Sequence, residues 1–105
     1  MKYMLIFADG ADNDEAAMQG VEAWWGKYSQ SGAIVGGERL QPSSRATTVR
    51  FDGGAASIVD GPFAETKETI GGYAIVEVPD LDAALEMAKS WPASPAVEIR
   101  PIWVD

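Results

Sequence analysis

The sequence contains no cysteine and no histidine, and each absence excludes whole classes of chemistry. Without cysteine the chain has no disulfide, no thiolate nucleophile and no cysteine-ligated zinc or iron–sulfur centre. Without histidine it has no imidazole base, no Ser-His-Asp or Cys-His machinery and no histidine-ligated metal or haem. Any chemistry must therefore come from carboxylates, arginine, lysine, tyrosine or a bound cofactor.

The chain is also poor in basic residues and in long apolar stretches. It has 8 lysines and arginines against 16 aspartates and glutamates, which gives a net charge of −8. Because this charge is repelled by phosphate backbones and anionic lipid, we expect neither a nucleic acid nor a membrane as a partner. No apolar stretch approaches the roughly 20 residues that span a bilayer, and the stretch 3–8 is too short for a signal-peptide core. We therefore expect a cytoplasmic protein.

The length of 105 residues and the hydrophobic content of 47% fit one domain with a buried core, over residues 1–105. Apolar periodicity and turn residues divide this domain into elements. We expect strands over 3–8, 33–40, 72–78 and 97–104, a hairpin of strands 47–51 and 56–59, and helices from Asp12 to Gly32 and from Asp80 to Trp91. This order predicts a ferredoxin-like α+β fold, an antiparallel sheet with two helices on one face and an inserted hairpin arm.

Local patterns add detail to this fold. The pair Gly36-Gly37 inside a strand indicates a bulge, or a close approach of another backbone or of a ligand. Trp24 and Trp25 point about 100° apart on a helix, so we expect one in the core and the other at a dimer seam or pocket. The apolar face of the second helix is expected to contain Leu81, Ala84, Leu85 and Ala88.

Both faces of the central strands are apolar. In the first strand Tyr3, Leu5 and Phe7 alternate with Met4 and Ile6. The strand over 72–78 carries Tyr73 and Ile75 on one face, and Ala74, Val76 and Val78 on the other. Since helices cover only one face of such a sheet, we expect a second copy to cover the other, which gives a homodimer through the sheet faces.

Residues 60–68, with the sequence DGPFAETKE, form a nine-residue motif that is followed by Gly71-Gly72-Tyr73. This motif resembles the signature of the DGPF-domain proteins, a branch of the YCII-related family. The resemblance extends over segments 2–6, 36–42, 47–50 and 97–101. It implies a dimeric α+β barrel of the ferredoxin-like kind, and a link to sigma factors of the extracytoplasmic-function class through gene neighbourhood. The His–Asp pair proposed as a catalytic dyad in the wider family has no counterpart, because this chain has no histidine.

The motif has a structural and a functional interpretation. In the structural one, Asp60 accepts backbone N–H groups in an Asx-turn, Gly61 adopts an unusual φ, Pro62 fixes its own φ, and Phe63 anchors the turn in the core. In the functional one, Asp60 is a carboxylate at the mouth of a cleft, with a raised pKa that suits an acid or a base.

The functional interpretation has further candidate residues. Tyr73 is a candidate catalytic hydroxyl beside Asp60. An anionic substrate group would be held by Lys67 with Arg39 or Arg50, since a guanidinium grips such a group with two hydrogen bonds. The set of candidate ligand-binding residues comprises Arg39, Arg50, Phe63, Glu65, Lys67 and Trp25. We expect no metal ion and no cofactor.

Three functions remain open at this point. The first is a dimer, non-enzymatic or weakly catalytic, that binds a small molecule in a pocket beside residues 60–63, with regulation as its role. The second is a cofactor-free enzyme, a lyase, isomerase or monooxygenase, that uses Asp60 with Tyr73 and an arginine. The third is a protein-interaction module that acts with a sigma factor, which the family resemblance alone implies.

Overall fold

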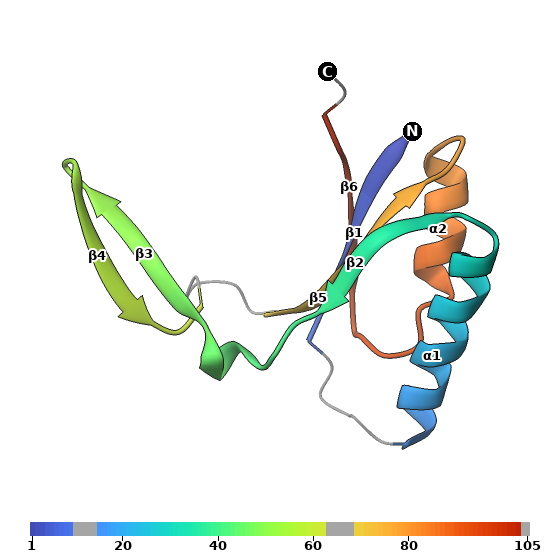
Figure 1. Cartoon of the computed structure of the whole chain (residues 1–105), viewed down its shortest axis with the longest axis horizontal. Helices are drawn as coiled ribbons and strands as arrows, with labels where there is room; N and C mark the ends of the chain where they lie inside the picture. Colours follow the sequence, from blue (N-terminus) through green and yellow to red (C-terminus); the bar gives the residue numbers. More distant parts are fainter. Residues whose placement is uncertain (10–14, 63–68, 104–105) are drawn as a thin grey trace.

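The computed structural model describes residues 1–9, 15–62 and 69–103. Two helices and six strands follow one another along the chain (Figure 1). In order they are β1 (Lys2–Ala8), α1 (Glu15–Gln30), β2 (Ile34–Arg39), β3 (Thr47–Asp52), β4 (Ala55–Asp60), β5 (Ile70–Glu77), α2 (Leu81–Lys89) and β6 (Val97–Pro101), with a short 3-10 turn, η1 (Ser43–Arg45), before β3.

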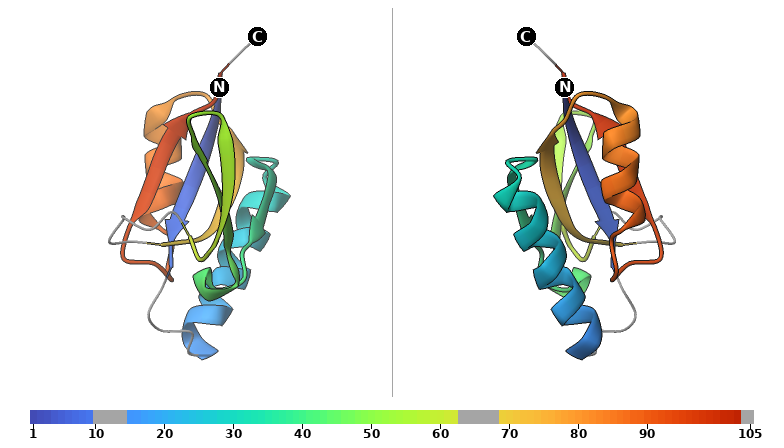
Figure 2. Two further views of the ribbon diagram at one scale, coloured as in Figure 1. Left: turned by 90° about the vertical axis from the view of Figure 1, so that its left-hand side faces the viewer. Right: turned by 90° about the vertical axis from the view of Figure 1, so that its right-hand side faces the viewer.

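Four of the strands form one antiparallel sheet in the order β2-β5-β1-β6. Both helices lie on the same face of this sheet, as the two side views make clear (Figure 2). The arrangement is compatible with a ferredoxin-like fold and confirms the mixed α+β class with both helices on one face. The remaining strands, β3 and β4, pair only with each other.

The core lies between the sheet and the helices. On β1 the side chains of Tyr3, Leu5 and Phe7 point to this side and are at most 3% exposed, as the period of two predicts. Trp24 of α1 is 5% exposed, and its indole N–H donates to the carbonyl oxygen of Met87 at 3.0 Å. The core therefore ties the first helix to the second through a satisfied buried donor.

The two helices begin and end largely as predicted. Gly32 follows α1 with a φ of +81°, a left-handed conformation that stops a helix. Asp12 lies outside the described residues. At α2 the Asp80 carboxylate accepts the Ala83 N–H at 2.9 Å, an N-cap that stabilises the helix by about 1 kcal/mol.

The apolar face predicted for α2 is wrong at its leucines. Leu81 and Leu85 are 48% and 37% exposed, whereas the side chains of Ala84 and Met87 are buried. Ala84 is fully buried, and so small a side chain lets the helix backbone lie close to the sheet. The helix therefore packs against the core through Ala84 and Met87, and the two leucines lie to the side of this contact.

The last strand is shorter than the predicted 97–104. β6 ends at Pro101, and Trp103 beyond it is 95% exposed. Val104 lies outside the described residues. Because β6 is an edge strand, Pro101 costs the sheet no internal hydrogen bond.

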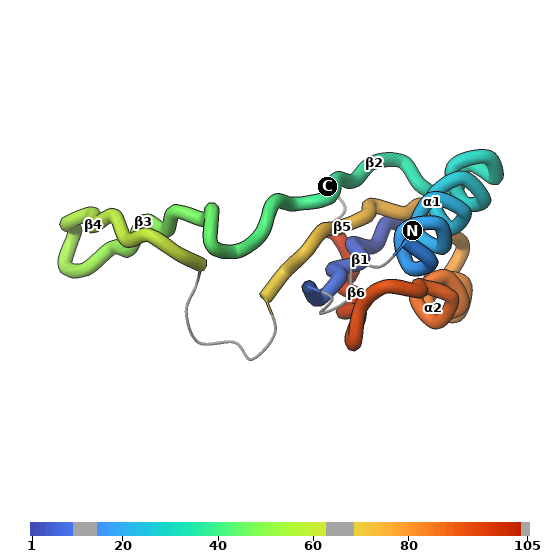
Figure 3. The backbone as a smooth tube through the Cα atoms, turned by 90° about the horizontal axis from the view of Figure 1, so that it is seen from below, coloured from blue at the N-terminus to red at the C-terminus, as the bar shows by residue number. Residues whose placement is uncertain are grey.

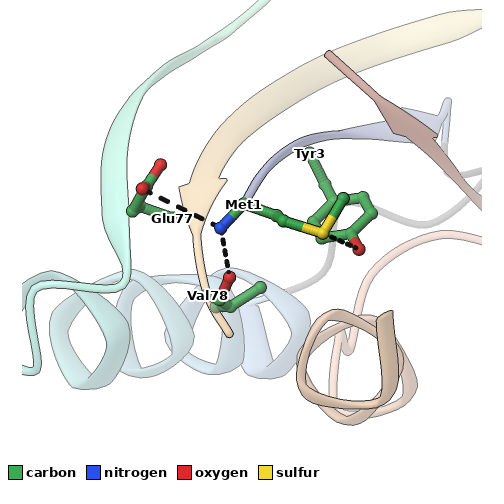
Figure 4. Close-up of polar contacts among 4 residues, drawn as sticks. All are labelled: Met1, Tyr3, Glu77 and Val78. Carbon is green, nitrogen blue, oxygen red and sulfur yellow. Dashed lines mark hydrogen bonds and ion pairs between the residues drawn. The ribbon is translucent and has the colours of Figure 1, made fainter. Parts of the chain in front are cut away.

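The N-terminal residue is fixed to the far end of β5 (Figure 4). Its ammonium group donates to the carbonyl oxygen of Val78 at 2.7 Å and lies 3.9 Å from a carboxylate oxygen of Glu77. The hydroxyl of Tyr3 donates to the sulfur of Met1 at 3.6 Å. These contacts hold β1 and β5 together at the end of the sheet where β1 begins.

The predicted hairpin forms the separate β3–β4 sheet, which we call the arm (residues 47–60). In Figures 1 and 3 it projects from the side of the sheet that the helices leave open. The radius of gyration, 15.5 Å, accordingly exceeds the about 13 Å expected of a compact chain of this length. Thr48 is the one buried residue of the arm.

The motif residues Asp60-Gly61-Pro62 close the base of this arm. Gly61 has a φ of +109°, and its N–H donates to the carbonyl oxygen of Ala46 at 2.8 Å. The hydroxyl of Thr48 donates to the Gly61 carbonyl oxygen at 2.6 Å. These bonds join the two ends of the arm, so this part of the motif has a structural role.

No helix in the described part of the chain is both long enough and apolar enough to cross a bilayer.

Candidate ligand cavity

A cavity of about 120 Å³ opens at the end of the sheet where β1 finishes. It lies between β1, α1, the end of β2 and the loop between α2 and β6. Its apolar wall includes Phe7, Met18, Val21, Trp25 and Trp91, and its polar groups include Asp9, Glu38, Arg39 and Ser94. This mixture of apolar wall and few polar groups is typical of small-molecule sites.

A pair of glycines brings the polar groups together. A Cβ at Gly71 would lie 3.1 Å from the Cα of Asp9 and 3.2 Å from its Oδ1. A Cβ at Gly72 would lie 3.0 Å from the Glu38 carbonyl oxygen and 3.4 Å from the Cα of Arg39. The two glycines therefore favour the close approach of the end of β1 and the end of β2 to β5 from its two sides.

Aromatic packing fixes the apolar wall. The rings of Phe7 and Trp91 are stacked, with centroids 3.8 Å apart and an angle of 12° between their planes. The indole N–H of Trp91 donates to the hydroxyl of Ser94 at 2.8 Å. Trp25 meets Trp24 edge to face, with centroids 5.5 Å apart. The Trp91 ring also meets Trp24 edge to face, with centroids 5.0 Å apart, so it is held by two other rings of the core.

Trp25 is held in place by Gly37 of β2. Gly37 has a φ of +141°, and a Cβ there would lie 2.7 Å from the tip of the Trp25 ring and 2.5 Å from the Tyr73 carbonyl oxygen. The pairing of β2 with β5 shifts register between Ile34 and Gly36. The bulge and the close approach expected of Gly36-Gly37 are both confirmed.

Charged groups stand at the mouth of the cavity. Asp9 and Arg39 are both exposed, and neither forms an ion pair within the described residues. The Arg39 guanidinium is a planar fork that binds carboxylate or phosphate groups with two hydrogen bonds. The arrangement can therefore hold a flat apolar group between indole rings and an anionic group at Arg39.

The predicted site residues fall in four places. Arg39 and Trp25 line the cavity, and Trp24 is the tryptophan in the core. Tyr73 is half-buried on the open face of the sheet. Asp60 and Arg50 are exposed in the arm, on a different sheet from Tyr73. The other three predicted positions, Phe63, Glu65 and Lys67, lie outside the described residues.

Sequence reasoning did not select Asp9, Trp91 or Ser94. A signal for Asp9 was present, because a carboxylate that directly follows a buried strand lies at a sheet end, where ligands commonly bind. The pair Gly71-Gly72 was a second signal, of close backbone approach rather than of a phosphate-binding loop. No local signal marks Trp91, whose place depends on the packing of Phe7 from the opposite end of the chain.

The YCII-related domain family matches residues 1–104, nearly the whole chain. The chain is also 35% identical over 95 residues to the uncharacterized protein R00369 of Rhizobium meliloti (strain 1021), an alignment that covers 87% of this chain and 77% of that protein. The wider family to which the motif at residues 60–68 pointed is thus confirmed, and the chain belongs to the YCII-related family.

Proposed function

We propose that the chain binds a small planar molecule with an anionic group, an aromatic or unsaturated carboxylate, in the cavity between Trp25 and Trp91. The observation that carries this proposal is the exposed Arg39, without an ion pair among the described residues, at the mouth of an aromatic cavity. The volume of about 120 Å³ compares with the roughly 150 Å³ apolar cavity that accepts benzene in another protein.

Binding without catalysis fits the residue types at the cavity. Asp9 supplies a hydrogen-bond acceptor that orients a ligand hydroxyl or amine, and Arg39 supplies the charge. The enzyme hypothesis requires Asp60 and Tyr73 to act together, and these residues belong to different sheets. That hypothesis, a regulatory role and the sigma-factor link remain predictions.

The test uses the tryptophans of the cavity as reporters. We expect benzoate to change the intrinsic fluorescence and to raise the melting temperature, and benzyl alcohol, which lacks the charge, to bind more weakly. Arg39→Gln should weaken benzoate binding by about 10-fold to 100-fold, because a charge-assisted hydrogen bond is worth roughly 1.5–3 kcal/mol. It should leave the affinity for benzyl alcohol unchanged.

Arg50→Gln is the matched control, since Arg50 is an exposed arginine on a strand of the arm. It should bind benzoate as the wild type does. An equal loss in both variants would mean that only overall charge matters. If a panel of aromatic and short unsaturated carboxylates leaves both fluorescence and melting temperature unmoved, the proposal is wrong.

A further inference from the structure

We propose that the ligand of the cavity is an aromatic carboxylate that also carries an ammonium group, and that Asp9 is the residue that selects this cation. The assignment rests on the proposed function, because Arg39 binds the carboxylate in both. It adds the charge at the other end of the ligand, and it narrows the ligand class from aromatic acids in general to zwitterions.

The two charged residues reach the cavity from opposite sides of β5. In the four-stranded sheet β5 lies between β2 and β1, as the view in Figure 3 shows. Arg39 is the last residue of β2 and pairs with Gly72 of β5. Asp9 directly follows β1, and its N–H donates to the Thr69 carbonyl oxygen at 2.6 Å, just before β5 begins. Because neighbouring strands lie about 4.8 Å apart, the backbones at the two charged residues are about 10 Å apart.

The register of the sheet directs the Arg39 side chain to the cavity. Phe7 of β1 and Arg39 of β2 both pair with Gly72, one from each side. Residues at the same register position on neighbouring strands point to the same face of a sheet. Since the Phe7 ring lies on the helix side, Arg39 points to that side as well.

A third charged residue at the cavity does not join this pair. Glu38 pairs with Tyr73, whose side chain lies on the open face of the sheet. The Glu38 carboxylate consequently points to that face, and the residue contributes its backbone to the cavity wall. Among the described residues, one carboxylate, Asp9, and one guanidinium, Arg39, remain to interact with a ligand in the cavity.

These two charges do not neutralise each other. Both residues are exposed, and neither belongs to an ion pair in the part of the chain that the structure describes. Two opposite charges held apart on one cavity are complementary to a ligand that is negative at one end and positive at the other. A ligand with a carboxylate alone pairs with Arg39, but it also brings a second anion near Asp9, where like charges repel.

The backbone that carries the Asp9 carboxylate is fixed on both sides. The N–H of Ala8 donates to the Ala96 carbonyl oxygen of the loop before β6 at 3.0 Å, and the N–H of Asp9 bonds to Thr69 on the side of β5. Gly71 lies so close that a Cβ there would be 3.1 Å from the Cα of Asp9. A charge on such a preorganised backbone loses little conformational freedom when a ligand binds, which favours selection.

The test compares ligands that have the same ring and differ only in one substituent. Tryptophan fluorescence titrations at neutral pH measure the affinities of para-(aminomethyl)benzoate, which is a zwitterion, and of para-methylbenzoate, which has the carboxylate alone. The wild type should bind the zwitterion about threefold to tenfold more tightly, because an ion pair with an exposed carboxylate is a modest interaction. High salt should reduce this preference.

Asp9→Asn keeps the shape of the side chain and removes its charge. This variant should bind the two ligands equally well. Asp52→Asn, at an exposed carboxylate at the end of β3 in the arm, is the matched control. It changes the net charge by the same amount and should keep the full preference for the zwitterion. If Asp9→Asn fails to fold by circular dichroism, Asp9→Ser replaces it.

The outcomes separate this assignment from the proposed function. Equal wild-type affinities for the two ligands, with both weakened by Arg39→Gln, would overturn the role of Asp9 and leave the proposed function intact. A preference that persists in Asp9→Asn, or that Asp52→Asn also loses, would overturn that role as well. Binding of the zwitterion that depends on Asp9 and not on Arg39 would support the cation site and contradict the proposed function. If neither ligand binds, both are wrong.

Discussion

In the four-stranded sheet, alternate side chains of β1 and β5 are buried against two helices, whereas in the arm only Thr48 is buried. Both regions consist of antiparallel strands that carry apolar residues. They differ in what covers the apolar face, because the sheet has α1 and α2 on one side and the arm has nothing from the described part of its own chain. Alternation thus specifies a strand and its two faces, and the covering layer decides how much stability the strand gains.

Glycine substitutions should give the largest difference in stability between the four-stranded sheet and the arm. Gly37→Ala places a Cβ 2.5 Å from a backbone oxygen of β5, at a φ of +141°, in strand β2 of the four-stranded sheet. Strain and overpacking together should cost more than about 4 kcal/mol, which is enough to leave much of the chain unfolded. Circular dichroism and thermal melting will measure the loss.

Gly53→Ala is the matched change at the tip of the arm. Gly53 has a φ of +57°, and nothing lies within 4 Å of a Cβ built there. We expect about 1–2 kcal/mol of local strain and no loss of the folded sheet. Equal melting curves for the two variants would show that the arm and the sheet unfold as one unit.

Truncations of buried and exposed apolar residues should give the next largest contrast. Leu5 is fully buried in β1. Leu5→Ala should therefore lower the free energy of unfolding of the protein by about 2–5 kcal/mol. Ile58→Ala in the arm should change that quantity by less than about 0.5 kcal/mol when the protein is dilute. Urea denaturation at several protein concentrations measures both.

Concentration dependence makes this second contrast informative. Because a partner that binds only the folded chain adds stability by mass action, the Ile58→Ala deficit should grow as the concentration rises into the range where the wild type dimerises. The Leu5→Ala deficit should be present at every concentration. A deficit for Ile58→Ala that is the same at all concentrations would place its effect inside one chain.

Most of the strands could be predicted from the sequence, because the information is local. The apolar runs of β1 and β5 and the turn residues between β3 and β4 each lie within a few neighbouring residues. The buried face of α2 could not be predicted in the same way. Hydrophobicity favours Leu85, but Ala84 and Met87 are the side chains that the fold buries.

The cavity, by contrast, could not be predicted from local patterns in the sequence. Asp9, Trp25, Arg39 and Trp91 are far apart in the sequence, and the strand order β2-β5-β1-β6 together with the helix packing brings them to one end of the sheet. The chemistry of Arg39 and Trp25 alone makes them candidates for a binding site. The remaining residues required the sheet order, which no local pattern contains.

The smallest expected effect concerns the base of the arm. Thr48→Val removes the hydroxyl that donates to the Gly61 carbonyl oxygen at 2.6 Å while keeping the side-chain shape. The loss of one such bond should cost about 1 kcal/mol, and it should appear as faster hydrogen exchange at amides of β3 and β4 with little change in β1 and β5. Thr48→Ser keeps the hydroxyl and should restore slow exchange. If exchange in β1 and β5 accelerates equally, the root of the arm is part of the same cooperative unit as the sheet, and the stability of the arm does not depend mainly on a partner.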